Sequence, residues 1–210
     1  GGACDDEAPP GAERLLDRVA PLGKIYLPDA SYREMTEWVL PAVQQNDYLD
    51  ARHGLGHDSR WPHIAPFVRG GFWRNFKVKY AEANEMYSRM MAVSNRLQAA
   101  IDSGAGGESL DYARTELYRG QCNCAYWHGT FGGVYYSHLR QAIYRHLIRA
   151  DDILDQTADR PDAWAEVSVR DHNLDAKPEV CLAGDQLVGF FEPHAGGSLY
   201  ELDLRHAARN

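Results

Sequence analysis

Residues 121–140 interrupt a long helical pattern with three glycines, and this interruption most constrains how the chain can fold. The stretch reads Q-C-N-C-A-Y-W-H-G-T-F-G-G-V-Y-Y-S-H-L-R, with Gly129, Gly132 and Gly133 in its middle. A glycine inside a helix costs about 1 kcal/mol relative to alanine, whereas a turn or a close backbone contact favours glycine. We therefore predict a break between two helices at this point.

Residue chemistry alone leaves two interpretations of this break open. Side chains that often contact ligands stand directly before the glycines, namely Asn123, Tyr126, Trp127 and His128. Their concentration predicts a binding site. A tight turn between helices, with two aromatic rings in the core, accounts for the same residues without any ligand.

Composition and charge exclude several classes of protein. The 210 residues suit one domain or slightly more, and a hydrophobic content of 44% is enough for a core. A net charge of −8 without clustered Lys or Arg argues against a nucleic-acid partner. Neither a run of about 18 apolar residues nor a signal-like N-terminus is present, so we expect a cytoplasmic protein with no membrane partner.

The four cysteines are too few and too unevenly spaced for a disulfide framework in a chain of this size. Cys122, Cys124 and His128 lie close together in the sequence. A structural zinc site needs four ligands, however, and a fourth is not evident. We therefore expect no metal and no cofactor.

The N-terminal residues 1–20 are expected to form a flexible tail or linker, because residues 1–13 are small, acidic and rich in proline. The chain begins Gly1-Gly2 without an initiator methionine, and it ends just after a strand-like segment. Both features lead us to expect a piece of a longer protein.

Residues 21–157 carry the pattern of a helical domain. Ser31 followed by Glu34 is a capping box that begins a first helix. Residues 44–66 have mixed charge, two glycines and no periodicity, so we predict a long loop with three solvated histidines. From residue 80 onward, apolar residues recur every three or four positions, which predicts about three long helices in an antiparallel bundle. These apolar residues include Met86, Met90, Val93, Leu97, Leu117, Ile143, Leu147 and Ile148.

A second dense segment, residues 67–76, reads F-V-R-G-G-F-W-R-N-F. Its paired glycines beside aromatic rings and arginines fit a ligand shelf, because aromatic faces stack on sugars or bases and arginine donates in a fixed fork. The same residues fit a turn into a helix equally well, with Phe72, Trp73 and Phe76 buried.

Residues 158–210 change to strand patterns. Alternation at period two marks short strands at 165–169, 180–182, 186–191 and 198–202. They predict the first strands of an antiparallel β-sandwich, too few to complete it. The chain is therefore expected to be an α+β protein, with a helical bundle followed by the start of a β domain.

Four segments, in chain order, resemble glycoside hydrolase family 57, and in particular its 4-α-glucanotransferases and α-amylases. They lie at 27–38, 69–76, 123–133 and 196–202, and contain L-P-x-A-S-Y-x-E-M-x-E-W, R-G-G-F-W-R-N-F, N-x-A-Y-W-H-G-x-F-G-G and G-G-S-L-Y-E-L. The resemblance covers about residues 20–205. It places the chain after the catalytic barrel of the family.

The resemblance implies that catalysis belongs to that preceding (β/α) barrel, which holds a glutamate nucleophile and an aspartate acid/base. Retaining chemistry needs two carboxyl groups about 5–5.5 Å apart, and no segment of this chain matches the barrel motifs that supply them. We therefore expect no catalytic residue here and no activity of the chain alone. The implied partners are an α-1,4-glucan or maltooligosaccharide and the missing barrel.

The family's Asn-Asp-x-x-Trp-His-Gly motif faces the substrate cleft, which makes Asn123, Cys124, Trp127 and His128 the candidate substrate-binding residues. An indole face can stack on a glucose ring, and Asn and His can hydrogen-bond its hydroxyls. Cys124 stands where the family usually has aspartate. Losing a charged hydrogen bond costs about 1.5–3 kcal/mol, so we expect altered activity or specificity.

Three functions are compatible with these residues. The chain is part of an α-glucan-acting transglycosylase or amylase, a stand-alone carbohydrate-binding module that uses Trp127 and Trp73, or a structural remnant without sugar binding. The four segments in register favour the first.

Overall fold

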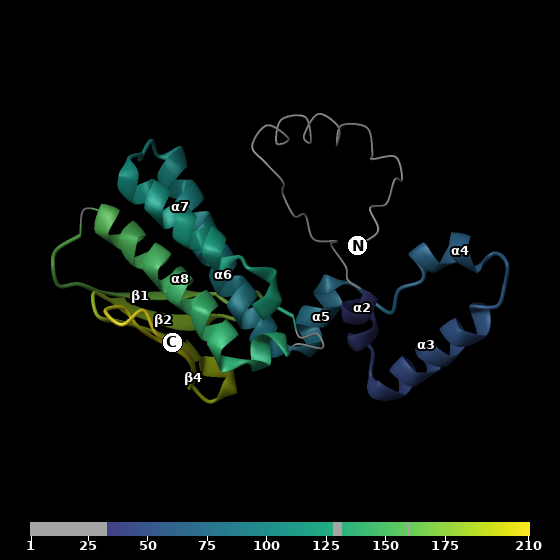
Figure 1. The fold of residues 1–210 in the computed structure, drawn as a ribbon. Helices are drawn as coiled ribbons and strands as arrows, with labels where there is room; N and C mark the ends of the chain where they lie inside the picture. The colour runs from purple at the N-terminus through teal and green to yellow at the C-terminus, as the bar shows by residue number, and fades with distance from the viewer. Residues whose placement is uncertain (1–32, 128–131, 159) are drawn as a thin grey trace. The chain divides into compact units, whose positions relative to one another are not determined.

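The computed structural model describes residues 33–127, 132–158 and 160–210, in which helices come first and strands last (Figure 1). The helical elements are α2 (Arg33–Trp38), α3 (Ala42–Leu55), α4 (Trp61–Ile64), η2 (Ala65–Phe67), α5 (Trp73–Lys79), α6 (Ala81–Asp102), α7 (Glu108–Gly120), η3 (Asn123–Ala125), η4 (Gly133–Tyr135) and α8 (Ser137–Thr157), where η denotes a 3-10 helix. The strands are β1 (Ala165–Arg170), β2 (Glu179–Gly184), β3 (Leu187–Glu192) and β4 (Ser198–Leu204), with η5 (Pro193–Ala195) before β4. This order confirms the predicted α+β class.

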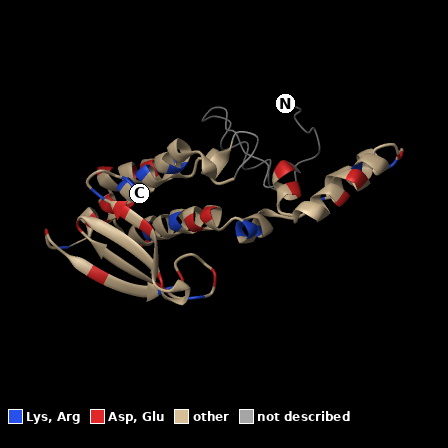
Figure 2. Ribbon diagram, turned by 90° about the horizontal axis from the view of Figure 1, so that it is seen from below, with Lys and Arg blue, Asp and Glu red and all other residues tan. Residues whose placement is uncertain are grey.

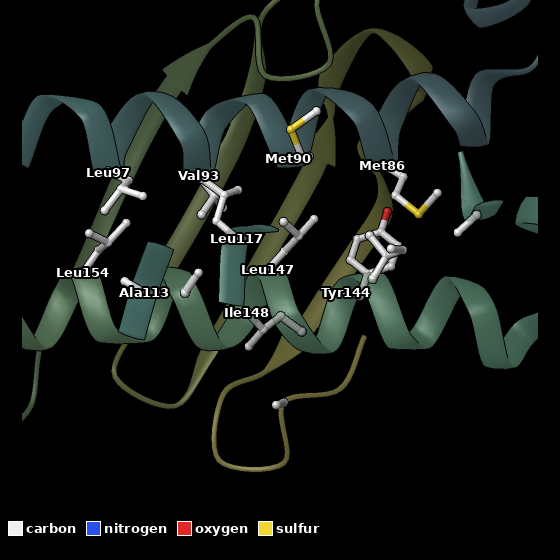
Figure 3. Packing of buried hydrophobic residues seen from close by; sticks show 14 of the residues in the cluster. Met86, Met90, Val93, Leu97, Ala113, Leu117, Tyr144, Leu147, Ile148 and Leu154 are labelled. Atoms are coloured by element: carbon white, nitrogen blue, oxygen red, sulfur yellow. The ribbon is translucent and has the colours of Figure 1, made fainter. Parts of the chain in front are cut away.

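The helices α6, α7 and α8 form the predicted bundle and share one hydrophobic core. Figure 3 shows the apolar side chains of α6 pointing toward those of α8, with residues of α7 beside them. Full burial of one such side chain contributes about 1.5–3 kcal/mol, so this cluster holds the three helices together. Its buried members include Met86, Val93, Leu97, Leu110, Ala113, Leu117, Ile143, Leu147, Ile148 and Leu154.

The four strands form one antiparallel sheet in the order β1-β2-β3-β4, so each strand pairs with the next one in the sequence. Val167 lies opposite Leu182 in this register, and Gly189 lies opposite both Leu182 and Leu202. These residues therefore share one face of the sheet, where Val167 is 65% exposed and Leu182 44% exposed. The described residues contain no second sheet, so the predicted sandwich stays a prediction.

The opposite face of the sheet carries acidic residues that pair with the bundle. The buried Arg89 of α6 donates to Glu201 at 2.9 Å and to Asp203 at 3.1 Å, both on β4, and to Asp151 of α8 at 3.0 Å. Burial alone would raise the pKa of Asp151, but the positive charges of Arg89 and Arg96 lower it to about 2. Arg89 therefore joins α6, α8 and β4. Removing one partner of such a buried ion pair lowers the stability of a fold by about 3–5 kcal/mol.

The predicted loop at 44–66 is wrong, because α3 and α4 occupy most of it. None of the 14 residues of α3 is buried, so the helix has no apolar stripe that a periodicity search could detect. Polar contacts anchor it instead: the Tyr48 hydroxyl donates to the Val68 carbonyl at 3.0 Å, and Arg52 donates to that hydroxyl at 3.0 Å. The three histidines of the segment are exposed, as predicted.

Several expectations fall on residues that the structure does not describe, namely the tail at 1–20, the capping Ser31, Gly129 and His128. The domain limits at 21–157 and 158–210 also stay predictions. Along the described helices and strands, acidic and basic positions are interspersed (Figure 2). None of the helices in the described ranges is both long and apolar enough to cross a membrane.

Candidate functional site

The predicted break after α7 is a turn built around Tyr126. The helix α7 ends at Gly120, and η3 begins three residues later at Asn123. The Tyr126 side chain is buried, and its hydroxyl donates to the Gly120 carbonyl, which is one of the acceptors left unpaired at the end of a helix. Burial raises the pKa of Tyr126 well above its ordinary value. Tyr126 is thus a core residue, as the interpretation without a ligand predicts.

Two glycines fold the chain back toward α8. Gly132 and Gly133 have φ angles of +86° and +47°, in the left-handed region that favours glycine. A Cβ atom on Gly132 would lie 2.7 Å from the Tyr136 ring. The predicted helix break is therefore confirmed at these two positions.

Trp127 follows the buried Tyr126 and is only half-buried. Its ring centroid lies 6.2 Å from that of Trp38, with the two planes inclined at 40°. Trp38 is the last residue of α2, and its carbonyl accepts hydrogen bonds from Lys79 Nζ at 2.5 Å and from the Tyr80 hydroxyl at 3.2 Å. Both donors belong to the junction of α5 and α6, which therefore holds Trp38 in place beside Trp127.

The paired glycines Gly70 and Gly71 bring this part of the chain close to α2. A Cβ atom on Gly70 would lie 2.3 Å from the Thr36 carbonyl oxygen, and one on Gly71 would lie 2.3 Å from Val39 Cγ2. These separations are far below any real Cβ contact. The glycines therefore serve backbone packing, which is a different role from the ligand shelf considered in the sequence.

The aromatic residues after these glycines follow the helix-entry interpretation in part. Phe76 is fully buried, and Trp73 stacks on it with ring centroids 5.3 Å apart. Phe72, however, is 63% exposed, so its predicted burial is wrong. The reason is its position at the N-cap of α5, outside the apolar face of that helix.

Asn123 and Cys124 occupy η3, directly before Tyr126. Asn123 is half-buried, whereas Cys124 is exposed, with its sulfur 3.6 Å from Asn123 Oδ1. Partial loss of solvent around the sulfur and the neighbouring Cys122 raise the pKa of Cys124, so it is a neutral thiol at pH 7. It does not provide the charge of the aspartate that the family motif usually has.

Cys124 also lines a pocket of about 480 Å³ between α7 and α8. Two other lining residues, Arg119 and His146, contact the fully buried Glu116 at 2.6 Å and 2.8 Å. Burial works to raise the pKa of Glu116, but the hydrogen bonds from His146 and Arg119 lower it overall. Trp127 is not among the residues that line this pocket.

The sequence analysis named Trp127 as a candidate binding residue but missed its neighbour Trp38, which entered only as part of the family segment at 27–38. The pairing depends on how α2 docks against α5, and no local spacing encodes it.

The zinc hypothesis stays untested, because His128 is not described. Among the described residues, no three His, Cys, Asp or Glu side chains converge as metal ligands.

Two protein-family models match the chain. The middle domain of the α-amylase/4-α-glucanotransferase family matches residues 71–154, and the C-terminal domain of the same family matches residues 171–210. The chain belongs to the α-amylase/4-α-glucanotransferase family. This confirms the resemblance inferred from the four sequence segments.

Individual members of the α-amylase/4-α-glucanotransferase family agree with this assignment. The chain is 39% identical over 195 residues to α-amylase 1 of Dictyoglomus thermophilum and 36% identical over 195 residues to the 4-α-glucanotransferase of Thermococcus litoralis. Each match covers 93% of this chain and 27% of the relative. The crystal structure of the Thermococcus litoralis enzyme superposes with a TM-score of 0.67, covering 89% of this chain and 26% of that one. The chain thus spans about a quarter of the length of these relatives.

Proposed function

We propose that this chain supplies part of the substrate cleft of an α-glucan-acting retaining hydrolase or 4-α-glucanotransferase, and that it works with a catalytic barrel outside these 210 residues. The proposed substrate is an α-1,4-glucan or maltooligosaccharide, and the proposed location is the cytoplasm. The supporting observation is the convergence of three family segments, at α2, at Gly70-Gly71 and at the turn after α7, on the Trp38–Trp127 pair.

The chemistry of this pair suits a sugar chain. A glucose ring has apolar faces and a rim of hydroxyl groups, and half-exposed indole rings provide apolar faces for such a ring. Asn123 can both donate and accept hydrogen bonds, and it stands four residues before Trp127. We propose that Trp127 stacks on a glucosyl unit while Asn123 and His128 bind its hydroxyls. Cys124 lies beside Asn123 as a neutral thiol.

We propose that the chain alone has no hydrolase or transferase activity. Retaining chemistry needs two carboxyl groups about 5–5.5 Å apart on either side of the scissile bond. The buried Glu116 and Asp151 are held in ion pairs with arginines, which removes them from this role. The two reacting carboxyl groups are assigned to the barrel.

A calorimetric titration with maltotetraose tests the binding role. We expect the 210-residue chain to bind the sugar and Trp127→Ala to abolish the binding, while the matched control Trp61→Ala on α4 leaves it unchanged. Equal loss in both variants would point to a general loss of structure. Unchanged binding in Trp127→Ala would contradict the assignment of Trp127.

Restoring the family aspartate tests the role of Cys124. Because a charged hydrogen bond contributes about 1.5–3 kcal/mol, Cys124→Asp should tighten maltotetraose binding about ten- to a hundredfold. Cys122→Asp adds the same charge two residues away and is expected to have no such effect. Equal gains in both variants would indicate a general effect of charge.

A chimera tests the catalytic context. Replacing the matching segment of the Thermococcus litoralis 4-α-glucanotransferase with this chain should yield a folded enzyme that transfers glucan, and the chain alone should be inactive. A chimera that folds with an unchanged melting temperature but transfers no glucan would contradict the proposed function.

A further inference from the structure

The strand β1 is an edge of the sheet, and no strand in the described ranges pairs with its other side. The order β1-β2-β3-β4 gives it a single neighbour, β2. Five of its six residues are exposed, and the remaining one, Ser168, is half-buried. An exposed edge strand presents a row of unpaired N–H and C=O groups, which is a template for another strand. The edge of β1 is therefore open to a partner.

The pairing with β2 determines which main-chain groups of β1 point toward the open edge. The Trp164 carbonyl accepts from the Asp185 amide, which directly follows β2, at 3.3 Å. The main-chain groups of Trp164 therefore point toward β2. Because successive residues of a strand direct these groups to alternate sides, those of Ala165, Val167 and Val169 face the open edge. A further strand has to bind these three residues.

The sequence of β1, A-E-V-S-V-R, is complementary to itself in an antiparallel pair. When Ser168 lies opposite Ser168 of a second copy, Glu166 lies opposite Arg170 of that copy. In the same register, Val167 lies opposite Val169. Opposite charges and β-branched residues directly across from one another stabilise a sheet. Each of these matches occurs twice, because the two strands are identical.

The main-chain directions agree with this register. Val167 and Val169 face the open edge, so they form hydrogen-bonded pairs with the valines of the second copy. Glu166 and Arg170 then occupy the non-hydrogen-bonded pairs, in which opposite side chains lie closer together. A shift of two residues, the smallest that keeps the outward groups paired, puts either Glu166 or Arg170 opposite Ser168. Both ion pairs are then lost, so charge specifies the register.

The two charged side chains have capacity for these contacts. Arg170 donates from Nε to His172 Nδ1 at 3.3 Å, and it forms no ion pair with a carboxylate in the described part of the chain. An arginine has five N–H donors, so the two terminal nitrogens of Arg170 are left for a partner. Glu166 contacts Arg160 through Oε2 at 2.9 Å, and its side chain is 54% exposed. Its Oε1 can therefore accept from a second arginine.

We propose that β1 pairs with β1 of a second copy of this chain, in an antiparallel and two-fold symmetric arrangement centred on Ser168. Opposite residues of such a pair have side chains on the same face, so the two four-stranded sheets become one continuous sheet. Val167 and Val169 of both copies lie on its exposed face. A two-fold interface uses the same surface of both copies, which closes the assembly at a dimer. Because one pair of short strands is smaller than a standard protein interface, we expect a micromolar to millimolar dissociation constant.

Sedimentation equilibrium of the 210-residue chain, from micromolar to millimolar concentration, tests this dimer. We expect a reversible monomer–dimer equilibrium. Arg170→Glu puts like charges opposite each other in two places and should weaken association about tenfold or more. Glu166→Arg combined with Arg170→Glu restores opposite charges in this register and should recover most of the association. The exposed control Arg145→Glu makes the same charge change on α8 and should associate as the wild type does.

A backbone variant tests the strand pairing separately from the charges. Proline is tolerated on an edge strand where the N–H group faces solvent. Val169→Pro therefore removes an outward N–H group and retains the hydrogen bonds to β2. We expect this variant to be a monomer with a circular dichroism spectrum like that of the wild type.

Three outcomes would overturn the proposal. One is a wild-type chain that stays monomeric up to millimolar concentration. Another is a dimer that neither Arg170→Glu nor Val169→Pro weakens, which would place the contact elsewhere, for example on the exposed valine face. The third is a doubly charge-reversed variant that associates no better than Arg170→Glu, which would exclude this register. Because the wild-type chain alone can contradict the dimer, a variant that fails to fold does not leave it untested.

Discussion

The indole rings of Trp38 and Trp127 lie with their centroids 6.2 Å apart, although one residue ends α2 and the other lies in the turn after α7. The docking of Trp38 depends on Lys79 and Tyr80, which bind its carbonyl. The glucose-binding surface that we propose at this place therefore has two parts, a ring that would contact the sugar and a neighbouring ring that would position it.

This arrangement predicts that Trp38→Ala weakens maltotetraose binding less than Trp127→Ala does, because it removes only the neighbour of the stacking ring. Trp38→Phe keeps an aromatic ring and should retain most of the binding. Calorimetry on the three variants gives the order of affinities. A Trp38→Ala variant that binds as tightly as the wild type would show that Trp127 is positioned without Trp38.

The close packing at Gly70 predicts a loss of stability in Gly70→Ala. The added Cβ atom would lie 2.3 Å from the Thr36 carbonyl oxygen. Overpacking of this kind typically lowers the free energy of unfolding by about 1–3 kcal/mol. Gly54→Ala is the matched control, because nothing lies within 4 Å of a Cβ atom there. That residue is inside α3, so alanine should stabilise by up to about 1 kcal/mol. Urea unfolding measures the change in the free energy of unfolding in both variants. Changes of the same sign in the two variants would contradict this prediction.

The buried pairs of Asp151 predict a specific dependence on pH. Its pKa of about 2 in the folded chain lies below the ordinary 3.8. Its ion pairs therefore stabilise the fold fully above about pH 4, and this contribution is lost as the pH falls toward 2. The shift corresponds to about 2 kcal/mol.

Asp151→Asn should lower the free energy of unfolding at pH 7 by about 3–5 kcal/mol, because it leaves Arg89 and Arg96 with fewer partners. It should then lose less further stability than the wild type between pH 4 and pH 3. Urea unfolding at pH 7, 4 and 3 checks both points, with Asp162→Asn as an exposed control. Parallel pH profiles of Asp151→Asn and the wild type would argue against this role of Asp151.

We expect the 210-residue chain to bind a hydrophobic dye on the exposed face of the sheet, the face that carries Val167 and Leu182. Val167 and Val169 are 65% and 64% exposed, and large exposed apolar patches bind apolar probes and promote association. Val167→Thr together with Val169→Thr should lower dye fluorescence, while the free energy of unfolding changes by about 0.5 kcal/mol or less. Unchanged fluorescence would show that the dye binds elsewhere.

Local patterns predicted the regular elements well where one face of each element is buried. The helices α6, α7 and α8 and the strands β2, β3 and β4 follow their apolar periodicity, because burial selects the residues on that face. Strand β1 alternates in the same way, although it buries no residue. The helix α3 was missed because it buries no residue and its sequence has no apolar stripe at helical spacing. The helix-entry interpretation of residues 67–76 buried Phe72, but its position at the start of α5 leaves it exposed.

The sequence by itself determined the family, the α+β class, the helix break at Gly132 and Gly133, and Trp127 as a candidate for sugar binding, because each depends on a local pattern or a motif. Only the tertiary structure decided that Trp38 is the neighbour of Trp127, that Gly70 and Gly71 pack against α2, and that Arg89 joins α6, α8 and β4. These features depend on contacts between segments that are distant in the chain, and such contacts leave no periodic signal in the sequence.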